Sequence, residues 1–134
     1  MTAIGFPDPR RASRDLLRSL LAARTEPYAQ GVTVSTKAPT STSALPFVQV
    51  KSDGRFRDSR LNGRATVRVL VYHRDEGLGE DLAGLAEALL LDSSSPEIRG
   101  FSPISGPIPT EDPDTGAPLS FFTITARLTP ANLP

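Results

Sequence analysis

The sequence predicts a single α+β domain, α/β in the broad sense, with a mixed and mainly antiparallel β-sheet, two helices packed on one face, and a long β-hairpin. Three observations support this prediction. Residues 64–73 alternate in polarity without Gly or Pro, which is typical of a strand with one buried face. Two leucine-rich segments repeat at helical spacing. The elements follow one another as helix, three strands, helix and two strands, and residues 1–134 suit one domain.

The strand expected at residues 64–73 is the longest β-branched and aromatic run, and we expect it to be central. Its two faces differ in composition. The apolar face holds Ala65, Val67, Val69 and Val71, and the other face holds Arg64, Thr66, Arg68, Leu70 and Tyr72. One face is therefore expected to contact the helices.

The first half of the chain contains a predicted helix and two strands. Asp8 is a good helix cap, Pro9 is tolerated in the first turn, and Pro27 is expected to stop the helix. A leucine stripe supplies its apolar face, at Leu16, Leu17, Leu20 and Leu21. The strands are expected at residues 31–35 and 46–51, separated by a polar loop.

A long hairpin is expected to join the second strand to the central one. Asp53-Gly54 and Asn62-Gly63 each have the composition of a tight turn. The residues between them, 55–61, are expected to form a basic loop.

The second half begins with a helix over residues 78–90, where Leu and Ala recur at helical spacing. Gly and Pro interrupt the next strand, residues 98–104, so it is expected at a sheet edge. Residues 105–118 are expected to form an acidic Pro/Gly-rich loop, and residues 119–128 the last strand. The tail, residues 129–134, is expected to be loosely held.

Composition excludes several function classes. Fifteen basic and fifteen acidic residues balance to zero, which argues against wholesale nucleic-acid binding. The chain has no Cys and one His, so thiolate chemistry and Cys-based zinc sites are excluded. The N-terminal residues do not resemble a signal peptide, and no segment is apolar enough to span a bilayer. We therefore expect a soluble protein made in a cytoplasm.

Candidate catalytic and metal-binding groups are few. His73 ends the central strand without an evident nucleophile or orienting carboxylate, and a structural role is favoured. Glu111, Asp112 and Asp114 are acidic, but they lack the spacing of a calcium loop and suit a solvated loop. We predict no catalytic residue, no metal site, no cofactor and no enzymatic activity.

The most informative surface feature is a basic cluster that includes an aromatic residue. It comprises Arg55, Phe56, Arg57, Arg60, Leu61 and Arg64. Such a cluster can bind single-stranded nucleic acid, or it can be a plain solvated hairpin. Because the chain also has an acidic loop, head-to-tail contact between copies is the preferred interpretation. Phe56 and Leu61 are then the expected apolar anchors, and Glu111, Asp112 and Asp114 form a second interface.

Several segments together resemble the tail terminator proteins, also called tail completion proteins, of long-tailed siphophages, especially those of actinobacterial hosts. The resemblance covers most of the chain and rests on overall pattern, because no single motif is diagnostic. The similar segments are residues 8–21, 31–34, 45–50, 64–72 and the acidic Pro-Asp-Thr-Gly-Ala-Pro stretch at 113–118.

The resemblance implies a structural virion protein that forms a hexameric ring. Such a ring caps the completed tail tube, meets the head-side connector or stopper, and lets DNA pass through its lumen without sequence-specific binding. It implies location in the tail or neck of the virion after assembly in the host cytoplasm. Two alternatives remain, namely a head-to-tail stopper (head-closure) protein and a nucleic-acid-binding module that uses the basic cluster.

Overall fold

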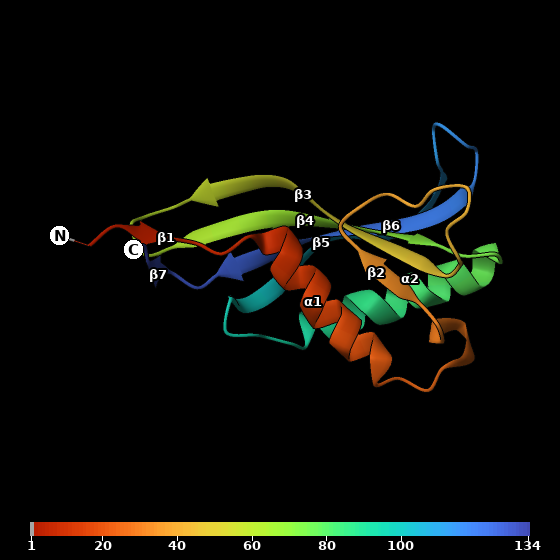
Figure 1. The fold of residues 1–134 in the computed structure, drawn as a ribbon, viewed down its shortest axis with the longest axis horizontal. Helices are drawn as coiled ribbons and strands as arrows, with labels where there is room; N and C mark the ends of the chain where they lie inside the picture. The colour runs from red at the N-terminus through yellow and green to blue at the C-terminus, as the bar shows by residue number, and fades with distance from the viewer. Residues whose placement is uncertain (1) are drawn as a thin grey trace.

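A computed structural model describes residues 2–134 and has two sheets and two α-helices. The main sheet has five strands in the order β2-β3-β4-β6-β5, mostly antiparallel, with β2 parallel to β3 (Figure 1). The α+β fold predicted from the sequence is therefore confirmed. The elements are β1 (Ile4–Gly5), α1 (Pro9–Ala22), the 3-10 helix η1 (Pro27–Ala29), β2 (Thr33–Ser35), β3 (Phe47–Arg57), β4 (Gly63–Tyr72), α2 (Glu76–Leu91), β5 (Ile98–Glu111), β6 (Pro118–Leu128) and β7 (Ala131–Asn132).

The central strand is β4, as its composition predicts. It pairs with β3 on one side and with β6 on the other. Its apolar face is fully buried in the main core, at Ala65, Val67, Val69 and Val71. Phe122 on β6 lies opposite Val69 and is also fully buried. These side chains form the apolar surface of the sheet on which both helices pack.

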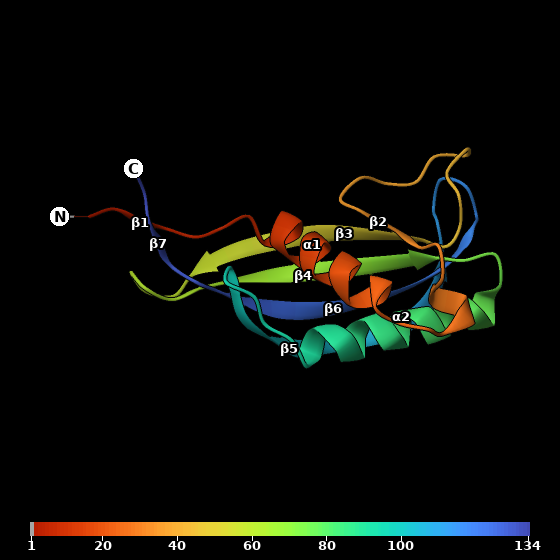
Figure 2. The same cartoon turned by 60° about the horizontal axis from the view of Figure 1, so that its bottom comes forward.

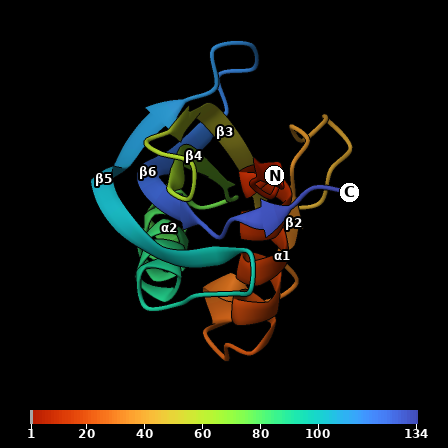
Figure 3. The same cartoon turned by 90° about the vertical axis from the view of Figure 1, so that its left-hand side faces the viewer.

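Both helices lie on one face of the sheet (Figures 2 and 3). The carboxylate of Asp8 caps α1 by accepting the backbone N–H groups of Arg10 and Arg11, as predicted. The helix ends at Ala22, several residues before the predicted stop. Pro27 instead begins η1, because proline is well tolerated in the first turn of a helix. No helix in residues 2–134 is long and apolar enough to cross a membrane.

The opposite face of the sheet carries a smaller apolar cluster. Phe47, Tyr72 and Leu119 are buried there, and Leu45 and Phe121 pack against them. Three neighbouring strands and the β2–β3 loop supply these side chains, at the end of the sheet where β4 finishes. This end of the molecule is therefore held together on both faces of the sheet.

The β3–β4 hairpin corrects the two predicted turns. Asp53-Gly54 lies inside β3, at a shift in register between Ser52 and Gly54. Gly54 does not adopt the positive φ that a tight Asp-Gly turn requires, and the irregularity is absorbed as a β-bulge. Pairing then continues to Arg57, which lies opposite Gly63. Residues 58–62 form the turn, so Gly63 already belongs to β4.

Strand β5 is longer than predicted. It continues to Glu111, so the expected loop at residues 105–118 shortens to residues 112–117. Pro103, Pro107 and Pro109 are tolerated because β5 is an edge strand, as predicted, and its register with β6 shifts in this region. Proline thus weakens the strand signal in the sequence without preventing the strand.

The tail is ordered, contrary to prediction. Residues 131–132 form β7 and pair with β1 near the start of the chain. The backbone N–H of Leu133 also donates to the carbonyl of Ala3, at 2.9 Å. Each strand has two residues, which is too short for an alternating pattern to reveal. The two ends of the chain consequently meet beside the tip of the β3–β4 hairpin (Figure 1).

Candidate assembly interface

The N-terminal arm, which we define as residues 2–7, is held by arginines of the β3–β4 hairpin. Arg55 donates to the carbonyl of Pro7 at 3.1 Å, and Arg57 donates to that of Ile4 at 2.9 Å. Arg60 donates to the carbonyl of Thr2 at 3.1 Å. These charge-assisted hydrogen bonds bind main-chain atoms and not side chains of the arm. The predicted basic cluster therefore contacts a segment of its own chain.

Phe6 provides the apolar contact of the arm. The guanidinium of Arg57 lies over its ring, 4.8 Å from the centroid, and the ring rests against Gly63. A Cβ atom at position 63 would lie 2.8 Å from Phe6 Cζ. The absence of a side chain at Gly63 thus makes room for the aromatic ring.

Replacing Gly63 by alanine should loosen the arm, because the added methyl group must displace the Phe6 ring. We expect a loss of about 1 kcal/mol in stability and faster hydrogen exchange at the Leu133 amide, which bonds to Ala3. Gly84→Ala is the control. Nothing lies within 4 Å of its added Cβ, and alanine should stabilise α2 by about 0.5–1 kcal/mol. An unchanged rate of hydrogen exchange at the Leu133 amide in the Gly63→Ala variant would contradict a role for the Phe6–Gly63 contact in holding the arm.

The two predicted apolar anchors are exposed near the arm. Phe56 and Leu61 each have 46% of their surface accessible. Arg64 lies over the Phe56 ring at 4.6 Å and pairs with Asp58 at 3.1 Å. Exposed aromatic surface supported by a neighbouring cation suits a contact with another molecule.

The structure brings the predicted basic residues together, but not all of them on a loop. Arg55, Phe56 and Arg57 belong to β3, whereas Arg60 and Leu61 lie in the turn. We call these five residues, together with Arg64, the basic hairpin tip. Sequence reasoning missed its association with the arm. The lone Phe6 near the start of the chain is the one available signal, and it does not identify its distant partner.

The acidic turn, residues 111–117, has a different construction. Asp112 accepts the backbone N–H of Asp114 at 2.8 Å and that of Thr115 at 3.2 Å. The hydroxyl of Tyr72 donates to the same carboxylate at 3.2 Å. The hydrogen bond from Asp114, with the contributions of Thr115 and Tyr72, lowers the pKa of Asp112. Asp112 therefore orders its own turn, while Glu111, at the end of β5, and Asp114 are exposed.

The Tyr72 phenol is buried beneath the acidic turn. Burial, followed by the negative charge of Asp112, raises the pKa of Tyr72 from 10.0 to about 12. Folding thus favours the protonated phenol. This contribution to stability is complete below pH 10 and is lost as the pH rises from 10 toward 12.

A tyrosinate absorbance titration tests this arrangement. In a Tyr28→Phe variant, Tyr72 is the remaining tyrosine, and its titration midpoint should be about 12 when absorbance is read immediately after a pH jump. Adding Asp112→Asn should lower the midpoint, because the nearby negative charge is removed. A midpoint of about 10 in the folded protein would show that the phenol is solvated.

The basic hairpin tip and the acidic turn lie at opposite ends of the sheet (Figure 1). The ten residues of β4 run between them, which corresponds to about 30 Å. The tip lies beside Gly63 at the start of β4, and the acidic turn contacts Tyr72 at its end. The predicted basic and acidic groups are thus too far apart to pair within one molecule.

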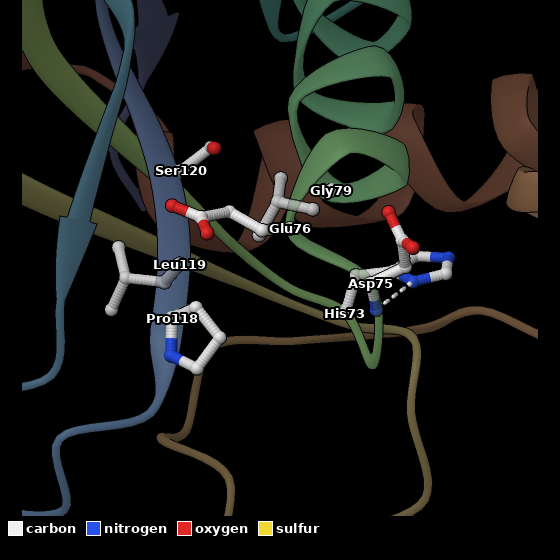
Figure 4. A pocket seen from close by; sticks show the side chains of 8 residues that line it. His73, Asp75, Glu76, Gly79, Pro118, Leu119 and Ser120 are labelled. Carbon is white, nitrogen blue, oxygen red and sulfur yellow. Dashed lines mark hydrogen bonds between the residues drawn. The ribbon is translucent and has the colours of Figure 1, made fainter.

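His73 occupies a structural position. Its Nδ1 accepts the backbone N–H of Asp75 at 3.2 Å, so Nε2 carries the proton and donates to the Tyr28 carbonyl at 3.3 Å. Figure 4 shows the His73 ring and the Glu76 carboxylate pointing apart. The pocket that these two residues help to line leaves no room for a water molecule. These groups do not converge on a shared reaction centre.

Residues 2–134 contain no group of three or more His, Asp or Glu side chains placed to hold a metal ion. No protein-family model matches the chain, and no curated protein matches it.

Proposed function

We propose that this chain is a structural subunit that joins head to tail with other copies in a closed ring. More specifically, the ring is the tail terminator of a long-tailed phage. It caps the completed tail tube, contacts the head-side connector and lets DNA pass through its lumen. The role involves no catalysis, and the mature location is the tail or neck of the virion.

The observation that carries this proposal is the opposite placement of the basic hairpin tip and the acidic turn. A heterologous contact needs two different, complementary surfaces on each subunit, and it closes into a ring when the rotation between subunits closes. The tip carries exposed arginines, and the acidic turn carries exposed carboxylates of Glu111 and Asp114. Charge of opposite sign at the two ends sets register and encounter between copies.

Exposed apolar side chains support the proposal further. Phe56 and Leu61 project from the basic hairpin tip, and Ile104 and Ile108 are exposed on edge strand β5, at 53% and 41%. Exposed ion pairs contribute only about 0–1 kcal/mol each, so affinity requires apolar contacts of this kind. Apolar groups near the charged surfaces supply the affinity that the charges alone do not provide.

The test combines biochemistry with a phage that lacks this gene. Purified protein, alone or with the tail tube protein, should form rings by light scattering and negative-stain microscopy. Tails from the deficient phage should be abnormal in length and unjoined to heads, and the wild-type gene should restore them. Normal, uniform tails joined to heads in the deficient phage would exclude a terminator.

The stopper alternative predicts a different defect. A phage without its stopper should make tails of normal length that stay separate from heads, because tube completion does not need that protein. The position of the gene adds a second criterion, since a terminator is expected just before the major tail tube protein.

The nucleic-acid alternative is less well supported, because the fifteen basic residues of the chain are balanced by fifteen acidic residues. We expect single- and double-stranded DNA to bind more weakly than about 1 µM at physiological salt in a filter-binding titration. Submicromolar binding with a steep salt dependence would favour a nucleic-acid-binding module instead.

A further inference from the structure

An open groove lies at the end of the sheet where β4 finishes, which is the end opposite the basic hairpin tip. We infer that this groove, which we call the end groove, receives Phe56 of the next copy in the proposed ring. The partner is thus a second copy of this chain. The inference rests on the proposed function and specifies which surface accepts the exposed aromatic side chain of the tip.

The end groove is lined mainly by apolar side chains. Its walls come from η1, the β2–β3 loop and the first turn of α2. The groove encloses about 430 Å³, and a cavity of about 150 Å³ is already large enough to bind benzene. There is therefore room for a phenyl ring. The apolar lining residues are Pro27, Tyr28, Leu45, Pro46 and Leu78.

The walls of the end groove are held in place within one copy. Nε2 of His73 donates to the Tyr28 carbonyl at 3.3 Å, which joins η1 to the end of β4. The backbone N–H of Thr33 donates to the Pro46 carbonyl at 3.2 Å, and Leu45 packs against the smaller apolar cluster of the sheet. The groove is therefore preformed, and little conformational freedom is lost when an aromatic side chain enters it.

Leu78 is an apolar residue of the groove that the fold of one copy leaves uncovered. The carboxylate of Asp75 accepts the backbone N–H of Leu78 at 2.9 Å, which fixes the first turn of α2. The Leu78 side chain is nevertheless 40% exposed, a level close to that of Phe56. A contact between Phe56 and Leu78 of neighbouring copies would remove two exposed apolar groups from water.

The charges at the two ends of the molecule favour this partner. Residues 55–64 contain four arginines and one aspartate, a net charge of +3. Residues 74–81, which border the groove, contain four carboxylates and Arg74, a net charge of −3, and residues 111–117 add three carboxylates without a basic residue. The tip of one copy therefore meets an acidic end of the next. Because the tip and the groove are different surfaces, the contact is heterologous, and successive tips lie about one length of β4 apart.

Photo-crosslinking from position 56 tests the contact without changing the groove. Phe56 is replaced by benzoylphenylalanine, which keeps an aromatic ring, and this variant is assembled with isotope-labelled wild-type chains. Mass spectrometry should find crosslinks to labelled peptides that contain Tyr28, Leu45 or Leu78. The same photoreactive group at Lys51, which is exposed on β3 away from the tip, is the control and should leave these peptides unmarked.

A matched pair of substitutions at Leu78 tests the receiving side. Leu78→Gln keeps the size, the neutral charge and the helix preference of the side chain, but it places an unpaired amide in the contact. We expect assembly to weaken about 10-fold or more by light scattering. Leu78→Met keeps an apolar side chain and should assemble like wild type. Both variants should keep the circular dichroism of the wild type, because Leu78 is outside the core clusters.

The outcomes separate this inference from the proposed function. Rings in which position 56 crosslinks only outside the end groove, and which form equally well from Leu78→Gln, would overturn the contact and leave the ring intact. Crosslinks in the groove of a second chain, found only in open assemblies that never close, would support the contact and contradict the ring. A protein that stays monomeric at all concentrations and with the tube protein, and forms no crosslink between chains, would overturn both.

Discussion

Replacing Phe122 by alanine is expected to lower the free energy of unfolding by about 3–5 kcal/mol. The phenyl ring of Phe122 is fully buried on β6, opposite Val69 of the central strand and beneath the helices. Alanine would remove most of this side chain and leave a cavity that close-packed neighbours fill only in part. Because the chain has no Trp, urea denaturation is best followed by far-UV circular dichroism.

The Phe56→Ala variant is the matched control for this measurement. It makes the same chemical change on the exposed hairpin, where Phe56 contacts Arg64 but lies outside the core clusters. We expect a loss of about 1 kcal/mol or less. Similar losses in the two variants would mean that Phe56 belongs to the core and that the hairpin is not a free surface.

The core could be predicted from the sequence because periodicity records burial. Alternation from residue 64 to 72 places Val67, Val69 and Val71 on one face, and all three are fully buried. The leucine stripe of α1 works in the same way, since Leu17 and Leu21 are buried. In these elements a residue is buried or exposed according to its position in the repeat of its own strand or helix. That repeat can be read from the local sequence.

The errors occur where distant pairing overrides local preference. Asp53-Gly54 has the composition of a turn, yet β4 continues alongside it and the pair is absorbed as a bulge. Pro107 and Pro109 suggest a loop, yet the edge position of β5 tolerates them. The β1–β7 pairing joins the two ends of the chain, and two residues per strand leave no periodic signal.

In the candidate interface, too, local features could be predicted from the sequence and contacts between distant segments could not. Sequence composition identified the exposed groups, including Phe56, Leu61 and Asp114. It did not reveal that Arg57 binds the arm or that Asp112 accepts a hydrogen bond from Tyr72. Such contacts depend on which distant segments become neighbours, and a single sequence specifies this only through the complete fold.

The Phe56→Ala variant should also weaken assembly by about 30-fold or more per contact, although the monomer remains folded. Truncation of a central aromatic anchor commonly costs about 2 kcal/mol or more at an interface, which corresponds to that change in affinity. Phe56 is the aromatic side chain of the basic hairpin tip, and 46% of its surface is accessible in the monomer. In the proposed ring, Phe56 is therefore expected to contribute more to the affinity between copies than the surrounding charged side chains do.

Complementation of the gene-deficient phage provides the measurement, scored as head-joined tails, with light scattering of the purified variant beside it. Lys51→Ala is the control, because Lys51 is exposed on the same strand but lies away from the hairpin tip. It should assemble like wild type. The Leu61→Ala variant tests the second anchor and should also reduce assembly. If Phe56→Ala is folded and assembles as well as Lys51→Ala, the tip is not the surface that joins copies, and the apolar contact must be sought on β5.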